Sequence, residues 1–250
     1  MHVDAVSDAD AAGWAVLRQA MERARAALGG RLVAAYAVGS LTHGGFAPDV
    51  SDVDGVLIVD RCDAAVADAI RGVRADGELG ARLSLFWGDW ATFGAPPDTA
   101  RLPPIVRLDL LRHGVALLGG PPPAGLPVPG DAELIAESAA FAAARLATVP
   151  DASALVAQGR RALTKTVLFP VRFLATAHAG LAGSNDEAVA WYVAARRPHA
   201  ALANAALRWR TEPLEDPGAA TRLVAAHLPG LYAETLATYE DHPAFRGVRT

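Results

Sequence analysis

A Pro/Gly-rich segment divides the sequence into two parts, and this division limits the possible folds more than any other feature. The segment reads GGPPPAGLPVPGD and covers residues 119–131. Proline cannot donate a backbone hydrogen bond, and glycine is unfavourable inside helices and strands, so the segment is typical of a stiff linker. We therefore expect two domains, at residues 1–120 and 132–250, joined by residues 121–131.

Helical and strand-like patterns alternate in the first part of the chain. Apolar residues at helical spacing predict helices, and short apolar runs predict buried strands. In chain order the expected elements are a helix at residues 8–29, strands at 31–38 and 55–60, a helix at 63–75, a strand at 81–87, and a helix with a short strand at 104–118. This order predicts an α/β (α+β) domain that binds ligands in loops at the ends of its strands.

The second part of the chain, after the linker, is alanine-rich and has a helical pattern almost to its end. The pattern is interrupted near Pro150, Gly180–Ser184, Pro198 and Pro213–Pro217, where proline and glycine favour turns. We expect an all-helical second domain.

Composition and charge restrict the partners and the location of the protein. The net charge is −4 and the isoelectric point is near 6.0, so nothing requires nucleic acid or an anionic membrane as a partner. The single cysteine, Cys62, excludes an intramolecular disulfide. The first residues lack the basic and apolar regions of a signal peptide, and no apolar run is long enough to span a membrane. We expect a cytoplasmic protein; the sequence does not fix its oligomeric state, although a monomer is favoured.

The stretch GSLTHGGFAPDVSDVDGVLIV, residues 39–59, combines a Gly-Ser pair with two carboxylates at the entrance of an apolar strand. Side chains two residues apart on a strand point to the same face, so Asp52 and Asp54 should project together. A magnesium ion would remove their mutual repulsion and could also bind phosphate. Gly39 permits close backbone approach to a ligand, and Ser40 can donate to phosphate. The alternative is an ordinary surface turn, in which aspartate is common.

This stretch resembles the signature of the nucleotidyltransferase superfamily related to DNA polymerase β. Within that superfamily, the loop is similar to that of aminoglycoside adenylyltransferases of the streptomycin/spectinomycin type. Residues 163–193, LTKTVLFPVRFLATAHAGLAGSNDEAVAWYV, resemble the C-terminal helical domain of the same group. The resemblance therefore touches both parts of the chain. It implies a mixed-sheet nucleotidyltransferase domain followed by a helical domain.

The resemblance also implies an activity and roles for particular residues. Ser40 and Ser51 are expected to contact phosphates, Asp52 and Asp54 to hold Mg²⁺, and Arg172 to reach the nucleotide phosphates from the helical domain. A hydroxyl of a small acceptor, aminoglycoside-like by resemblance, would attack the α-phosphate of ATP. AMP would be transferred and pyrophosphate released, with catalysis by positioning and charge neutralisation.

Three features depart from the family pattern. The first is a third carboxylate that the family supplies from a later strand, where this chain has Ser84 in the expected place. Serine cannot replace a carboxylate base near neutral pH. Asp89 could substitute if the strand bends or contains a bulge. Asp109 is another candidate, although its helical pattern favours a role on a helix face or as a cap.

The other two departures lie in the helical part. Asn185 stands where the family tends to carry a phosphate-binding lysine, and Lys165 is far from it along the chain. Drug-modifying members carry acidic residues ahead of the arginine helix. Here Arg160 and Arg161 occupy this region and would repel a polycation unless they face outward.

Several further side chains have both a functional and a structural interpretation. His43 could touch phosphate or metal, or be a solvated loop residue; Trp87, Trp90 and Phe93 could stack on a base or pack in the core; Trp191 fits interior packing, and His113 fits a helix end. No two histidines have metal-ligand spacing, so zinc is not expected.

Two hypotheses of different classes follow. The first is a two-domain enzyme that transfers AMP from Mg-ATP to a small-molecule hydroxyl. The second is a catalytically impaired superfamily member that binds nucleotide or a partner, because Ser84 and Asn185 replace expected groups. A short antitoxin-type nucleotidyltransferase fits poorly, because such proteins lack a helical domain of this size.

Overall fold

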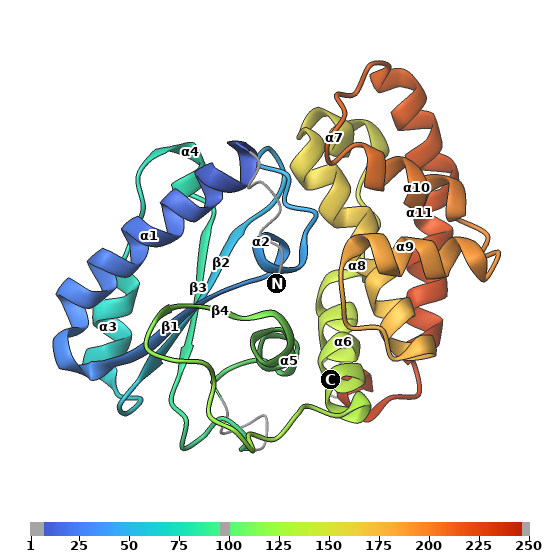
Figure 1. The fold of residues 1–250 in the computed structure, drawn as a ribbon. Helices are drawn as coiled ribbons and strands as arrows, with labels where there is room; N and C mark the ends of the chain where they lie inside the picture. The colour runs from blue at the N-terminus through green and yellow to red at the C-terminus, as the bar shows by residue number, and fades with distance from the viewer. Residues whose placement is uncertain (1–7, 96–100, 247–250) are drawn as a thin grey trace. The chain divides into compact units, whose positions relative to one another are not determined.

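The computed structural model describes residues 8–95 and 101–246, and its chain divides into two compact units between Pro129 and Gly130 (Figure 1). The elements of the first unit are α1 (Asp8–Leu28), the 3-10 turn η1 (Gly29–Arg31), β1 (Leu32–Val38), α2 (Ser40–His43), β2 (Val53–Val59), α3 (Ala64–Gly72), α4 (Gly77–Gly80), β3 (Leu83–Gly88), α5 (Pro104–His113) and β4 (Val115–Leu118).

The first unit is built on a mixed four-stranded sheet with the order β3-β2-β1-β4. Strand β1 pairs antiparallel with β2 and with β4, whereas β2 pairs parallel with β3. The β1–β2 register places Val38 opposite Asp54, and the β2–β3 register places Asp54 opposite Ser84. The end of β1 and the starts of β2 and β3 therefore meet at one edge of the sheet.

Helices cover both faces of this sheet, because alternate strand residues are apolar on each side. Leu57 and Val59 of β2 pack in one core cluster with Leu28 of α1 and residues of α3. Val56 and Ile58 belong to another cluster, with α5 on the opposite face. Residues of β2 two apart share a face, so Asp52 and Asp54 lie on the α5 side.

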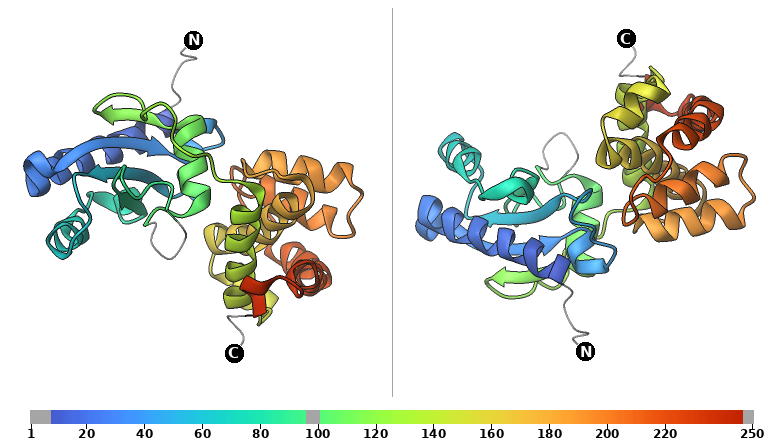
Figure 2. Two further views of the ribbon diagram at one scale, coloured as in Figure 1. Left: turned by 90° about the horizontal axis from the view of Figure 1, so that it is seen from below. Right: turned by 90° about the horizontal axis from the view of Figure 1, so that it is seen from above.

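The second unit is all-helical, and its longest elements surround α8. Helix α8 contacts α6, α7, α9, α10 and α11, and Figure 2 shows these helices from two further sides. The elements are α6 (Asp131–Arg145), α7 (Ala152–Ala157), α8 (Arg160–Ala179), α9 (Asn185–Ala194), α10 (Ala200–Arg208), α11 (Pro217–Tyr239) and α12 (Pro243–Arg246). None of the described helices is both long and apolar enough to cross a membrane.

The fold class predicted from the sequence is confirmed, because a mixed sheet with helices precedes an all-helical region. The helix breaks follow local signals. Gly180 ends α8 in a left-handed conformation with a φ of 63°. Ser184 caps α9 and forms a capping box with Glu187. The short helices α2 and α4 were not predicted, because four residues carry no periodic pattern.

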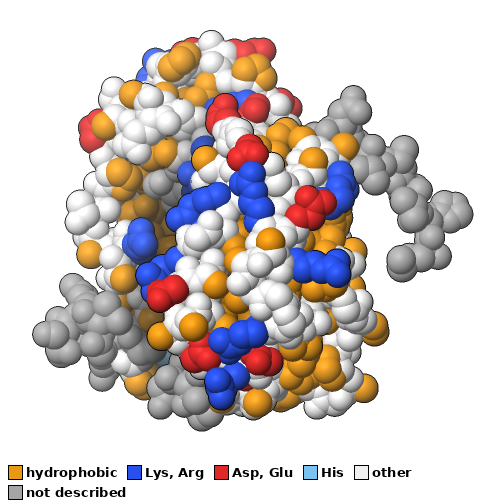
Figure 3. Space-filling view, turned by 90° about the vertical axis from the view of Figure 1, so that its left-hand side faces the viewer, with side chains coloured by type: hydrophobic (Ala, Val, Ile, Leu, Met, Phe, Trp, Pro, Cys, Tyr) orange, Lys and Arg blue, Asp and Glu red, His pale blue; other side chains and the backbone are white. Residues whose placement is uncertain are grey.

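Charged side chains of both signs are interspersed on the side of the molecule drawn in Figure 3. Exposed ion pairs of the first unit include Arg23 with Asp76 and Arg71 with Asp68. Such pairs contribute little stability each. A mixed surface of this kind fits the small net charge.

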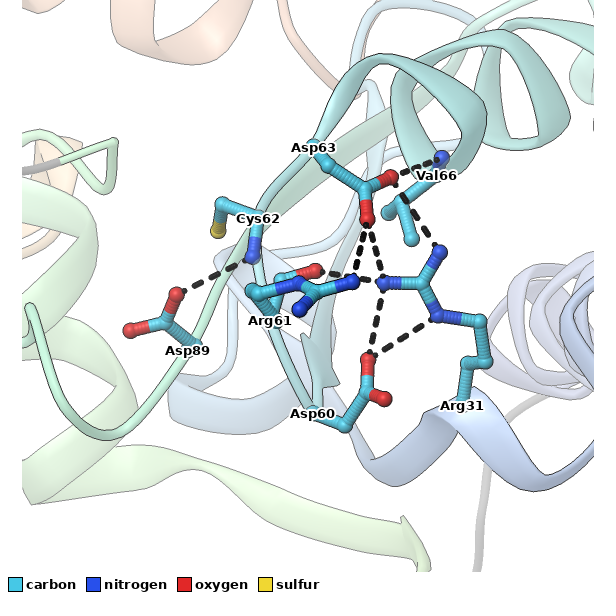
Figure 4. Close-up of polar contacts among 7 residues, drawn as sticks. All are labelled: Arg31, Asp60, Arg61, Cys62, Asp63, Val66 and Asp89. Carbon is cyan, nitrogen blue, oxygen red and sulfur yellow. Dashed lines mark hydrogen bonds and ion pairs between the residues drawn. The ribbon is translucent and has the colours of Figure 1, made fainter.

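Arg31 joins two carboxylates at the end of the sheet away from Asp54 (Figure 4). Its Nη2 donates to Asp63 Oδ2 at 2.8 Å and to Asp60 Oδ1 at 3.0 Å. Asp63 also caps α3 by accepting from the Val66 backbone at 3.0 Å. The Arg31 side chain, followed by the Val66 amide, holds the pKa of Asp63 well below its usual range.

The lowered pKa of Asp63 predicts a pH dependence of stability. A lowered folded-state pKa adds stability above the unfolded value, about 3.9, and that stability is lost as the pH falls through the folded value. Asp63→Asn retains a helix cap but removes the charge. We expect Asp63→Asn to lower the melting temperature at pH 7 and to flatten its decline below pH 4.

Asp68→Asn is the matched control, because Asp68 is an exposed acid of the same region, paired with Arg71 within α3. Its melting curve between pH 7 and pH 2 should follow the wild type. Parallel acid declines in wild type and Asp63→Asn would contradict the assigned role of Asp63.

Candidate active site

The Gly39-Ser40 turn directly follows β1. Gly39 has φ 75° and ψ −156°, a conformation that side chains other than glycine rarely adopt, and it precedes the single helical turn α2. The backbone amide of Thr42 donates to the Gly39 carbonyl at 3.0 Å, and the Thr42 hydroxyl donates to the same oxygen at 2.9 Å. These bonds fix the turn against the end of the strand.

Asp54 lies directly against this turn. A Cβ atom added to Gly39 would come within 2.6 Å of Asp54 Oδ2. No side chain larger than hydrogen fits there without moving the carboxylate. The structure therefore brings together the Gly-Ser pair and the carboxylates that the sequence stretch predicted to be neighbours.

Asp52 and Asp54 flank the fully buried Val53 and are themselves partly exposed. Two carboxylates on one strand face are oxygen donors of the kind that magnesium prefers. Among the described residues, no group of three or more His, Cys, Asp or Glu side chains is arranged to hold a metal ion. Magnesium binding by Asp52 and Asp54 stays a prediction.

Ser51 is buried, and its hydroxyl helps to shape the loop before β2. The Ala47 amide donates to Ser51 Oγ at 3.0 Å, and the Ser51 amide donates to the Ala47 carbonyl at 2.7 Å. The Ser51 carbonyl accepts from Arg82 Nη1 at 3.1 Å. Phosphate contact by Ser40 and Ser51 stays a prediction.

Ser84 occupies the position on β3 beside Asp54, as the register shows. The β2–β3 pairing continues without a shift to Ile58 opposite Gly88, so β3 does not bend Asp89 toward the carboxylate pair. Five residues of strand separate Ser84 from Asp89, a distance of about 16 Å. The structure does not bring Asp89 to Asp52 and Asp54.

Asp89 instead stabilises the loop after β3. It is 6% exposed and accepts from the Thr92 amide and hydroxyl, both at 2.8 Å, and from the Cys62 amide at 3.2 Å (Figure 4). The sequence interpretation of Asp89 as a third site carboxylate is thus corrected to a structural role. Burial, together with the Asp89 carboxylate, raises the pKa of Cys62 to about 12, so this thiol is not a nucleophile near neutral pH.

Asp109 is the carboxylate that does reach the turn, from α5. The Gly39 amide donates to Asp109 Oδ2 at 2.6 Å, and Asp109 Oδ1 lies 3.9 Å from His43 Nε2. The rings of His43 and His113 meet edge to face at 5.5 Å. The sequence pattern favoured a helix-face role for Asp109, and its only signal was an acid among leucines.

The aromatic residues at the end of β3 and after it pack against other side chains and do not form an open stacking surface. Phe93 is 2% exposed and contacts Trp90, which also meets Tyr36 edge to face. The guanidinium of Arg101 lies 3.6 Å above the Trp87 ring. These contacts favour the packing interpretation of the cluster.

The residues predicted in the helical part lie in the second unit. Arg172 and Lys165 are seven residues apart on α8, two helical turns, and therefore share a face. Asn185 is the first residue of α9. Arg161 is exposed, whereas Arg160 donates to the Glu212 carbonyl at 3.1 Å. Roles of Arg172 and Asn185 toward nucleotide stay predictions.

Trp191 of α9 packs among polar neighbours within the second unit. Its ring stacks on His178 at 6.1 Å, and the Arg197 guanidinium lies 5.1 Å from it. The predicted interior packing of Trp191 agrees with its partial burial.

Comparisons with known proteins support the fold. No family model matches the sequence, and a search of curated protein sequences finds no match. Among solved structures, the chain is similar to spectinomycin adenyltransferase AAD(9) from Enterococcus faecialis, crystallised with ATP and spectinomycin. The TM-score is 0.60 at 16% sequence identity, over 88% of this chain and 99% of that chain. The chain therefore shares its overall fold with that protein.

The contact between Gly39 and Asp54 gives a prediction for stability. Gly39→Ala should lose more stability than Gly44→Ala, because both residues have similar glycine-only dihedral angles but only Gly39 faces a carboxylate. The backbone strain alone should cost about 1–3 kcal/mol in each variant. Urea unfolding of both variants measures the difference, and equal losses would contradict a close packing of Asp54 on the turn.

Proposed function

We propose that this protein is a nucleotidyltransferase that moves AMP from Mg-ATP to a hydroxyl of a small molecule and releases pyrophosphate. The observation that carries the proposal is the placement of Asp54 on Gly39, which joins a Gly-Ser turn to a pair of carboxylates at one sheet edge. The nucleotidyltransferase-like fold supports the same activity.

In this proposal each residue at the sheet edge has a binding role. Asp52 and Asp54 hold the magnesium ion, which when bound neutralises charge on the carboxylates and the phosphates. Ser40 donates to phosphate oxygens, and the absence of a side chain at Gly39 lets the Asp54 carboxylate lie against the turn. Asp109 fixes the turn by accepting a hydrogen bond from the Gly39 amide.

Positioning of the nucleotide would supply most of the rate enhancement of the transfer reaction in such a site. The turn, held by Thr42 and Asp109, keeps its donors in place before the nucleotide arrives, so little free energy is needed to organise them. Arg172 and Asn185 of the second unit stay candidate nucleotide-binding residues, Arg172 for the phosphates.

The proposal also includes the chemical class of the acceptor. An aminoglycoside-like acceptor is supported by the similar structure, which contains spectinomycin. Arg161 is exposed on α8, so it can point away from a polycation. The Arg160 guanidinium contacts a backbone carbonyl within its own unit.

A second candidate function is nucleotide binding with poor transfer. The observation in its favour is that Ser84, not a carboxylate, lies beside Asp54 on β3. A site of this kind would bind Mg-ATP but deprotonate the acceptor slowly. Pyrophosphate release with a panel of hydroxylated acceptors separates the two functions, because only the enzyme turns over.

Nucleotide binding itself gives a direct test. ATP at about a hundred times its dissociation constant should add roughly 2.7 kcal/mol to the folded state. We expect the melting temperature to rise with ATP only when magnesium is present, and Asp52→Asn and Asp54→Asn each to abolish this magnesium-dependent rise. GTP, CTP and UTP, measured in the same way, identify the preferred base.

Asp68→Asn is the control for loss of one negative charge in the same unit, and it should retain the full rise. If no nucleotide stabilises the wild type, or if Asp52→Asn and Asp54→Asn respond like the wild type, the proposed site is wrong.

A further inference from the structure

Arg82 stands next to the carboxylate pair on the neighbouring strand. Leu83 is the register partner of Val53, and the Val53 amide donates to the Arg82 carbonyl at 3.1 Å. The hydrogen-bonded pairing of β2 with β3 therefore extends to the residue before Leu83 and aligns Arg82 with Asp52. The sequence alone does not point to Arg82, because only the strand register shows which residue adjoins Asp52.

The guanidinium of Arg82 reaches the loop that carries the pair. Its Nη1 donates to the Ser51 carbonyl at 3.1 Å, and Ser51 is bonded directly to Asp52. The Arg82 residue is partly buried, and its Nε is buried without a hydrogen-bond partner. Within residues 8–95 and 101–246, Arg82 forms no ion pair with a carboxylate.

The positively charged Arg82 guanidinium therefore has an uncharged hydrogen-bond acceptor, the Ser51 carbonyl, as its protein partner. Partial removal from water is unfavourable for a cation unless an anion or several acceptors compensate. A guanidinium has five N–H donors, and the Ser51 carbonyl accepts from one nitrogen. Because Nε is buried, the donors left for phosphate oxygens are those of the two Nη atoms, and arginine binds phosphate through such donors.

We propose that Arg82 is a nucleotide-binding residue that holds phosphate oxygens of the triphosphate beside Asp52. The inference rests on the proposed function and adds a fixed cation to its binding site. Charge on the phosphates would then be neutralised from two sides, by magnesium on the carboxylates and by the Arg82 guanidinium.

One alternative is that Arg82 merely balances the charge of Asp52 and Asp54. Such an arginine would pair with a carboxylate oxygen, whereas the contact observed for Arg82 is with a backbone carbonyl. A second alternative is a purely structural tie between β3 and the loop at Ser51. The structural alternative predicts a change in stability without a change in phosphate affinity, so binding measurements distinguish it from the proposal.

The proposal predicts that part of the phosphate affinity does not require magnesium. Inorganic tripolyphosphate in the presence of a chelator should bind the wild type weakly and should bind Asp52→Asn at least as well, because a repelling carboxylate is removed. Arg82→Gln should lose this binding. For Mg-ATP, loss of a charge-assisted hydrogen bond should raise the dissociation constant about tenfold or more.

Isothermal titration calorimetry with tripolyphosphate and with ATP, each with and without magnesium, makes the comparison. Arg82→Lys should retain part of the affinity, because lysine keeps the charge but not the planar fork. Arg25→Gln, an exposed arginine of α1, is the control and should bind like the wild type. Melting temperatures without ligand report any structural effect separately.

The outcomes separate this inference from the proposed function. If the wild type binds Mg-ATP and Arg82→Gln binds it equally well, the role of Arg82 is wrong and the proposed function stands. If the wild type binds neither tripolyphosphate nor any nucleotide, both are wrong. A selective loss of phosphate affinity in Arg82→Gln, partly restored in Arg82→Lys, supports the inference.

Discussion

The close approach of Asp54 to Gly39 determines the geometry of the candidate site. It depends on the antiparallel register that places Val38 opposite Asp54, and on a glycine backbone with a φ of 75°. In this conformation of the turn, Asp109 accepts a hydrogen bond from the Gly39 amide. A shift of the register by one residue would turn the Asp54 side chain to the opposite face of the sheet.

The sequence predicted much of the fold, because its signals are local. Apolar runs located β1, β2 and β3, and proline and glycine located most helix breaks. The pairing of Asp52 with Asp54 follows from the two-residue period of a strand. The partners of this pair could not be predicted in the same way. Ser84 was expected beside it, but Arg82 and Asp109 lie 30 and 55 residues from Asp52 and Asp54, and only strand register and helix packing bring them near.

Asp89 shows why such long-range placement fails from sequence. Five residues after Ser84, an acid can join the site only if the strand bends, and the sequence contains no feature that decides this. In the structure the strand is regular, and the Asp89 carboxylate accepts from the amides of Cys62 and Thr92. The Thr92 hydroxyl is a third donor to the same carboxylate, so Asp89 stabilises the loop after β3.

The two ends of β2 carry acidic residues in different environments. At one end, Asp60 and Asp63 share the guanidinium of Arg31, so their charge is balanced by a protein cation. At the other end, Asp54 meets a glycine turn, and the nearby Arg82 bonds to a carbonyl. The first arrangement stabilises the fold, whereas the second is suited to a cation and an anionic ligand.

The most direct measurement replaces magnesium by paramagnetic Mn²⁺ and records amide NMR signals with ATP present. The account predicts strong broadening at Gly39 and Asp54 and much weaker broadening at Asp63, which lies about 20 Å away along the strands. Broadening confined to the Asp63 end, or none at either end, would contradict it.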